Sequence, residues 1–294
     1  MSHNNHKATT LPAAHKLYIW NGELLFLSNA PMPNRAHRVV QEKLLICLEG
    51  TLSLYPCSSR GNESMVITGS CLLRTGVLLD KARIDGRNAV LAIVYLAPFS
   101  QDYPALESLM EKASEGIYYN HPQEQALAQQ LRSLRDGPAR SPKEVQRQLR
   151  DLMIPTQVSR FVFREFDQRI LDIVQRIRGS LRENLSLGEL AAAVNLSGSR
   201  LEKLFKQQTG LPITQYRLRY RVFYSAVLMA QGRTVTDAAQ EAGFSSSAHF
   251  SRAFRAINGL APSTPFLKPP FLQTFIDEDV MQTLASTTNR QFTI

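Results

Sequence analysis

Several features that mark particular protein classes are missing from this sequence. No run of about 18 apolar residues is present, so no segment is long enough to cross a membrane as a helix. The first 20 residues lack the apolar core of a secretory signal, which predicts a cytoplasmic protein. The three cysteines are an odd number without C-x-x-C spacing. They favour buried free thiols over a disulfide framework or a metal site.

Catalytic signatures are missing as well. The sequence holds no P-loop, no dinucleotide-binding glycine pattern and no Ser/His/Asp grouping. These absences argue against an enzyme and predict neither a cofactor nor a bound metal.

Positive charge is present in excess and is unevenly placed. The chain carries a formal net charge of +9, with 34 Lys/Arg and 25 Asp/Glu. Residues 160–268 hold 16 of those cations but only 8 of the anions, so almost the whole excess falls in this part. A basic domain joined to a neutral one suggests a polyanionic partner, and nucleic acid is the first candidate.

The hydrophobic pattern divides the chain into segments. Short strand-like runs separated by glycines over 17–97 predict a β-sandwich or small barrel. From Pro98 to residue 135 the period becomes helical. One seam of that part, Leu127, Leu131 and Leu134, could either pair with a second subunit or cover the strands. The predicted units are a disordered tail (1–16), a front domain (17–135), a linker with one short helix (136–165), a rear all-α domain (166–268) and a C-terminal tail (269–294).

Within the rear domain a short pattern occurs twice. The stretch "NLSGSRLEKLFKQQTGLP" aligns with "GFSSSAHFSRAFRAINGLAP" at an offset of 48 to 49 residues. In each copy a short helix, a turn at Asn195 or Gly243, and a second helix capped by serine are predicted. Small alanines on the first helix allow close crossing of the second. This is the pattern of two helix-turn-helix units, each exposing one helix that could enter a DNA major groove.

A helix between the two units is predicted from Pro212 to Gly232. About 20 residues at 1.5 Å each give roughly 30 Å, close to the ~34 Å turn of B-DNA. A stiff connection of this length could hold both exposed helices in successive grooves.

These motifs resemble the AraC/XylS family of transcription regulators over residues 167–266. The resemblance is carried by "LEKLFKQQTG", by Gly243-Phe244, by "FSRAFR" at 250–255 and by Pro262-Ser263. Lysine stands where the family usually has arginine at 203, and Pro265-Phe266 replaces the usual Tyr-Arg. The resemblance implies that the protein binds double-stranded DNA, forms a homodimer and contacts RNA polymerase. It also implies that the protein activates transcription more than it represses it.

The resemblance also implies roles for individual residues. By that analogy the base-contacting positions are Ser199, Glu202, Lys203, Ser247, Ala248 and Arg252. The expected phosphate contacts are Ser197, Arg200, Lys206, Arg217, Arg219 and Arg255.

Many members of the family carry a cupin-like barrel in front, which binds a small-molecule effector, followed by a helical dimerisation segment. Residues 17–135 follow that order. A metal-dependent cupin enzyme would need an H-x-H pair and a further histidine, and residues 70–97 contain no histidine. Six cations of the front domain could meet an anionic effector: Arg35, Arg38, Lys43, Arg74, Arg83 and Arg87, of which Arg35, Arg38, Arg74 and Arg83 are the named candidates. A protein antagonist acting on the front domain is the alternative to a metabolite.

Overall fold

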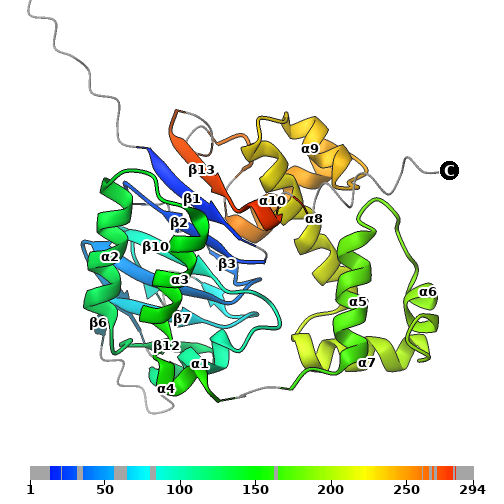
Figure 1. Ribbon diagram of the computed structural model, residues 1–294, viewed down its shortest axis with the longest axis horizontal. Helices are drawn as coiled ribbons and strands as arrows, with labels where there is room; N and C mark the ends of the chain where they lie inside the picture. The colour runs from blue at the N-terminus through cyan, green and yellow to red at the C-terminus, as the bar shows by residue number, and fades with distance from the viewer. Residues whose placement is uncertain are drawn as a thin grey trace, which may run out of the picture.

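The computed structural model of this 294-residue chain describes residues 14–20, 22–31, 36–55, 65–79, 84–161, 165–259, 261–264, 267, 270–280 and 282. It has two domains, a sheet-rich front domain and an all-α rear domain, which lie side by side (Figure 1). The two-domain plan predicted from the sequence is confirmed.

The front domain is built around one large sheet. Its strands follow the order β11-β12-β7-β4-β10-β2-β1-β13, with neighbours antiparallel except for the parallel pair β1 and β13. These strands are β1 (His15–Ile19), β2 (Leu24–Leu27), β4 (Lys43–Glu49), β7 (Ser70–Leu73), β10 (Val90–Tyr95), β11 (Glu111–Ser114), β12 (Ile117–Tyr119) and β13 (Leu272–Ile276). The chain turns at Glu49-Gly50 after β4, and Gly50 takes the left-handed φ of +78° that a side chain would resist.

Two smaller sheets complete the front domain. One pairs β3 (His37–Arg38) with β8 (Leu78–Leu79), and the other holds β6 (Val66–Thr68), β5 (Leu52–Leu54) and β9 (Ile84–Asp85). Among the described residues the strands thus form three sheets, and none of them closes on itself. The cupin-like barrel expected from the sequence is therefore not confirmed.

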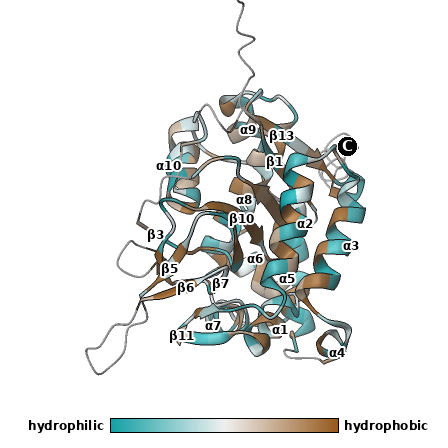
Figure 2. Cartoon of the chain, turned by 90° about the vertical axis from the view of Figure 1, so that its left-hand side faces the viewer, coloured by the Kyte–Doolittle hydropathy of each residue, from teal (hydrophilic) through white to brown (hydrophobic). Residues whose placement is uncertain are grey.

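Helices cover one face of the large sheet. They are α1 (Asp102–Leu109), α2 (Glu124–Asp136), α3 (Pro142–Met153) and the short α4 (Thr156–Ser159). Figure 2 shows α2 and α3 with polar and apolar sides, the pattern of helices that pack one face on a core. The helical period predicted after Pro98 holds for α1 but not for residues 111–119. These residues form the hairpin β11–β12 around Gly116.

In this helical layer the structure favours one of the two alternatives for the leucine seam and departs from one prediction about the linker. The seam of Leu127, Leu131 and Leu134 is at most 4% exposed and belongs to the core that α2 shares with the sheet. Those side chains cover the sheet and are not available to a second subunit. Helix α3 was assigned to a linker, yet it packs in the same core, and the Trp20 indole N–H donates to the carbonyl of Pro142.

The rear domain consists of six helices within the described residues. They are α5 (Gln168–Gly179), α6 (Leu187–Ala192), α7 (Gly198–Thr209), α8 (Ile213–Ala230), α9 (Val235–Glu241) and α10 (Ser247–Asn258). Two cores lie inside, one around α5 to α7 and one around α9 and α10, and α8 contributes to both. Four aromatic residues are buried in these cores: Phe205, Phe244, Phe250 and Phe254.

Both ends of the chain depart from the predicted tails. His15 and Lys16 already belong to β1, and residues 272–276 form β13 beside it. Figure 1 shows this last strand, in orange-red, next to the blue first strand. The C-terminal segment therefore returns to the front domain.

Candidate nucleic-acid interface and interdomain pocket

The first helix-turn-helix unit pairs α6 with α7. Ser186 caps α6 in a complete capping box with Glu189, which satisfies backbone donors at the helix start. The turn residue Asn195 has a φ of +53°, a region that asparagine tolerates better than most residues. Ser197 then accepts from the backbone N–H of Arg200 and starts α7. The short helix, the turn at Asn195 and the serine-capped second helix predicted for this unit are confirmed.

The second unit, α9 and α10, follows the same plan 48 to 49 residues later. Thr234 caps α9 and Ser246 caps α10 through the backbone N–H of His249. Gly243 has a φ of +78°, and a Cβ there would lie 2.6 Å from the carbonyl oxygen of Leu181. This close approach requires glycine, because any side chain would collide with backbone.

The residues predicted to read bases lie on the outer sides of α7 and α10. Ser199, Lys203, Ala248 and Arg252 are exposed, and Glu202 and Ser247 are partly exposed. Among the described residues, the side chains of Glu202, Lys203 and Arg252 form no hydrogen bond or ion pair. The inner sides of the same helices bury Leu201 and Phe205, or Phe250 and Phe254. Each helix is thus anchored by its apolar side with its polar side outward.

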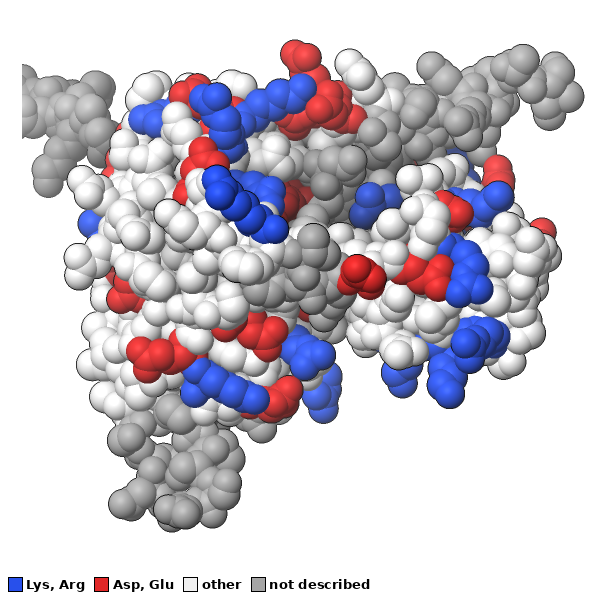
Figure 3. Space-filling model, turned by 60° about the horizontal axis from the view of Figure 1, so that its bottom comes forward, with Lys and Arg blue, Asp and Glu red and all other residues white. Residues whose placement is uncertain are grey.

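The residues predicted to contact phosphate divide into two groups. Ser197, Arg200, Lys206 and Arg255 are exposed, and in the view of Figure 3 cations project from the lower border of the rear domain. Arg217 instead donates to Asn184 Oδ1 at 2.9 Å and to the Leu185 carbonyl at 2.6 Å. These bonds brace α8 against the loop before α6.

Arg219 is the clearest exception. Its guanidinium turns toward the front domain, and its Nη2 is buried without a hydrogen-bond partner among the described residues. Burial lowers the pKa of Arg219 to about 10, partly offset by the carboxylate of Glu42. The phosphate role predicted for Arg219 is therefore wrong in this structure.

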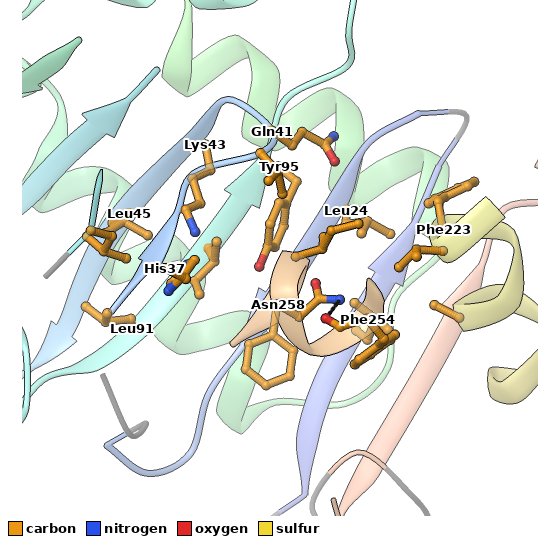
Figure 4. A pocket seen from close by; sticks show the side chains of 18 of the residues that line it. Leu24, His37, Gln41, Lys43, Leu45, Leu91, Tyr95, Phe223, Phe254 and Asn258 are labelled. Carbon is orange, nitrogen blue, oxygen red and sulfur yellow. Dashed lines mark hydrogen bonds between the residues drawn. The ribbon is translucent and has the colours of Figure 1, made fainter. Parts of the chain in front are cut away.

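That side chain lies at an apolar cavity of about 220 Å³ between the two domains. Its front wall comes from β2, β4 and β10, and its rear wall from α8 and α10. Residues on the two walls include Leu24, Phe26, Lys43, Leu45, Leu91, Ile93 and Tyr95 in front, and Arg219, Val222, Phe223, Ala226, Phe254, Ile257 and Asn258 behind. In Figure 4 the side chains of Lys43, Tyr95 and His37 lie close together at one side of the leucine-lined space.

Lys43 is the front-domain cation of this pocket. It is only 5% exposed, and its Nζ lies 5.6 Å from the centre of the Tyr95 ring. Neither a hydrogen bond nor an ion pair joins its ammonium to any residue that the structure describes. Burial lowers the pKa of Lys43 to about 8, and the nearby thiol of Cys71 works in the opposite direction. Burial also raises the pKa of Tyr95 to about 12.

A buried ammonium, a phenol and a buried guanidinium nitrogen around apolar walls make a site for a molecule with one acidic end. Among the described residues, neither Lys43 nor Arg219 forms an ion pair, so an anionic group would offset the desolvation of both cations.

Two of the four effector candidates named from the sequence, Arg38 and Arg74, lie away from the apolar cavity. Arg38 donates to the Gly76 carbonyl, and Arg74 pairs with Glu115 at 3.3 Å. Both line a separate polar hollow and not the apolar cavity. Arg35 and Arg83 lie outside the described residues. Lys43 was considered with the other cations of its domain, but no local pattern separates it from them.

Within the described ranges, no group of three or more His, Cys, Asp or Glu side chains is arranged to hold a metal ion. In the same part of the chain, no helix is both long and apolar enough to span a bilayer. Of the cysteines, Cys71 is buried and Cys47 is half-buried, while Cys57 falls outside the described residues.

Known proteins resemble the rear domain in sequence. The family model of a helix-turn-helix domain matches residues 190–266. The regulator GbdR of Pseudomonas aeruginosa is 30% identical over 118 residues, which are 40% of this chain and 32% of GbdR. The transcriptional activator RhaR of Escherichia coli is 32% identical over 98 residues, 33% of this chain and 35% of RhaR. The chain thus spans about a third of the length of these relatives.

Solved structures resemble the whole fold. A substituted apo form of ToxT from Vibrio cholerae matches with a TM-score of 0.54 at 12% identity, covering 84% of this chain and 97% of ToxT. ToxT with a bound unsaturated fatty acid matches with a TM-score of 0.52 at 13% identity, covering 83% and 94%. At this identity the likeness concerns the fold alone. The chain therefore carries a helix-turn-helix domain within a two-domain fold like that of ToxT.

Proposed function

We propose that this protein is a cytoplasmic, sequence-specific DNA-binding regulator of transcription, controlled by a small molecule bound between its domains. The observation that carries the DNA-binding part is the pair of capped units whose outer helices, α7 and α10, keep their polar sides free. Helix α8, with 18 residues, gives a spacing of about 27 Å along its axis. This length suits helices that enter successive major grooves of one duplex.

Arg252 and Arg255 allow a direct test of this reading, because both are exposed on α10 and differ in the role we assign. Arg252 is proposed to contact a base, and Arg255 a phosphate. We expect Arg252→Ala to relax sequence preference at one position of the site, where the wrong base now costs about 1–3 kcal/mol. Arg255→Ala should instead weaken binding to all sequences alike and reduce the salt dependence by about one counterion.

The measurement is selection of randomised duplexes with the full-length protein and each variant, followed by titration at several salt concentrations. Equal loss across all sequences for Arg252→Ala would refute its base-reading role. If the unchanged protein prefers no duplex sequence at all, the proposed function itself is wrong.

The small-molecule part of the proposal rests on the interdomain cavity. We propose that it binds an apolar molecule with a carboxylate, whose anionic end meets Lys43 and Arg219. Solved structures of ToxT hold an unsaturated fatty acid or (E)-4-(8-methylnaphthalen-1-yl)but-3-enoic acid as bound molecules. Both are carboxylic acids with a large apolar part, which is the chemistry that the cavity of this chain favours.

The remaining parts of the proposal rest on family likeness. They are activation more than repression, homodimer formation, contact with RNA polymerase, a cupin-like ancestry of the front sheets and the absence of enzymatic activity. Control by a protein antagonist is the alternative to a metabolite. It would suit a filled front domain with an exposed apolar patch, whereas an apolar cavity with two buried cations favours the metabolite.

A further inference from the structure

The C-terminal strand joins the rear domain to the front domain by backbone pairing. β13 lies parallel to β1 over five residue pairs, from His15 with Leu272 to Ile19 with Ile276. At one end the N–H of His15 donates to the carbonyl of Phe271 at 2.8 Å, and at the other the N–H of Asp277 donates to that of Ile19 at 2.9 Å. The chain reaches this strand directly after the second helix-turn-helix unit. Backbone pairing therefore ties that unit to the front sheet.

Side chains of the same segment enter both cores. Phe275 stacks on Tyr18 with ring centres 4.6 Å apart and packs on the front core. Ile276 and Val280 pack with the rear core around α9 and α10, which also holds Ile19 of β1. Residues 270–280, which we call the clasp, thus lie between two cores. The second unit cannot move away from the front domain while the clasp keeps both sets of contacts.

We propose that the clasp holds the second helix-turn-helix unit against the front domain before any molecule enters the interdomain cavity, and thereby keeps the cavity in its binding shape. This inference rests on the proposed small-molecule site. The cavity has its walls on both domains, so a ligand can contact all of them only in the closed arrangement. The rear core around α5 to α7 has a contact of its own with the front domain, since the ring of Phe99 lies 5.7 Å from the ring of Tyr216, a residue of α8 in that core. The clasp therefore acts on the α10 side of the cavity.

The energetic consequence follows from population shift. A ligand that binds only the closed form has an apparent dissociation constant equal to the intrinsic one divided by the closed fraction. If loss of the clasp leaves about one tenth of the molecules closed, the apparent affinity falls about tenfold although every cavity residue is unchanged. A saturating ligand should in turn restore the closed form, because it bridges the two walls.

The strand offers a matched pair of proline substitutions. In the parallel ladder every second residue of β13 directs its N–H toward β1. The N–H of Asp277 donates to the carbonyl of Ile19, so Gln273, four residues earlier, is one of these residues. Thr274 directs its N–H away from β1. Gln273 is exposed, so Gln273→Pro removes a ladder donor without removing a packed side chain. Thr274→Pro places the same ring one residue on, at an edge position that proline tolerates.

The experiment compares full-length wild type, Gln273→Pro and Thr274→Pro. Small-angle scattering without ligand reports whether the domains separate, and calorimetric titration with palmitoleate reports affinity. We expect Gln273→Pro to enlarge the radius of gyration without ligand, to bind palmitoleate about tenfold more weakly, and to regain the compact form at saturation. Thr274→Pro should stay within about twofold of wild type.

Each outcome bears on one claim. Unchanged scattering and affinity in Gln273→Pro would overturn the clasp, as would equal effects of both prolines. A larger ligand-free radius in Gln273→Pro alone would support the clasp even if palmitoleate bound to none of the three proteins. That last result would refute the proposed ligand class instead. Circular dichroism that matches wild type identifies variants that remain folded, and Ile276→Lys supplies a second disruption if Gln273→Pro does not fold.

Discussion

Replacing Lys43 by methionine should make the free protein more stable and its ligand affinity much lower. Methionine keeps the length of the side chain and removes the charge. The fall of the Lys43 pKa from 10.5 to about 8 corresponds to about 3 kcal/mol by which burial disfavours the ammonium. Because Lys43 is only 5% exposed, solvent screens little of this cost. At pH 7 we therefore expect Lys43→Met to raise the free energy of unfolding by up to about 3 kcal/mol.

The sign of the pH dependence follows from the same values. Below pH 8 the lysine is charged in both folded and unfolded chains, so the full cost is present. Between pH 8 and 10.5 the folded chain releases its proton first, and the cost declines. Above 10.5 both states are neutral and the cost is gone. The stability difference between Lys43→Met and wild type should thus shrink over that window.

Ligand affinity should change in the opposite direction. An ammonium and a carboxylate about 4 Å apart attract by about 4 kcal/mol at an effective dielectric constant of 20. Part of this is lost to residual desolvation, so removing the charge should weaken palmitoleate binding by at least about 2 kcal/mol, or about 30-fold. In wild type the affinity should also fall by up to tenfold per pH unit above 8, because Lys43 must then take up a proton. Neighbouring Tyr95 and Cys71 do not interfere, since burial raises the pKa of both above this window.

Calorimetric titration of palmitoleate from pH 7 to 10 tests this reasoning, with chemical denaturation for stability. Palmitoleyl alcohol, which has the same chain without the charge, should bind wild type and Lys43→Met about equally. Arg38→Met, which removes a cation outside the cavity, should leave affinity unchanged. The reasoning fails if Lys43→Met binds the acid within threefold of wild type, or if wild-type affinity stays flat up to pH 10.

Two further predictions concern stability. Gly243→Ala should lower the free energy of unfolding by well over 1 kcal/mol in denaturant titration, because the added Cβ would meet the carbonyl oxygen of Leu181. Gly210 has a similar positive φ but open space around it, so Gly210→Ala should lower the free energy of unfolding by only about 1 kcal/mol. Equal losses of stability in the two variants would contradict the steric argument. Burial raises the pKa of both Glu23 and Asp102, so at pH 7 wild type should be less stable to unfolding than Glu23→Gln. This stability difference should vanish as the pH falls below the ordinary values of 4.5 for Glu23 and 3.8 for Asp102, because both carboxyls are then protonated in the folded and the unfolded chain. A stability difference that does not depend on pH would contradict this prediction.

Much of the rear domain could be predicted from the sequence because its signals are local. Ser186 and Glu189 lie within one helical turn and form the capping box that their spacing predicts. Asn195 and Gly243 take the positive φ values that the two tight turns demand. Such features depend on neighbours a few residues away, and sequence patterns report neighbours well.

Features that depend on distant partners could not be predicted. The period of Leu131 and its neighbours shows that one face of α2 is buried, but both a sheet and a second subunit would satisfy it. Arg217 and Arg219 are two residues apart on the same helix, yet one braces a loop and the other turns into the cavity. β13 pairs with a strand more than 250 residues earlier in the chain. No local pattern distinguishes such a strand from a short apolar stretch in a tail.

The position of α10 connects the two proposed activities within one helix. Its inner side places Phe254, Ile257 and Asn258 at the cavity, while Arg252 and Arg255 stand on exposed positions of the same three turns. Any molecule that fills the cavity therefore contacts a proposed reading helix directly, and no relay through other elements is required. By linkage, a ligand that fixes α10 relative to the front domain must change DNA affinity by the same factor as DNA changes ligand affinity. Measuring either factor would show whether ligand binding and DNA binding are coupled in this protein.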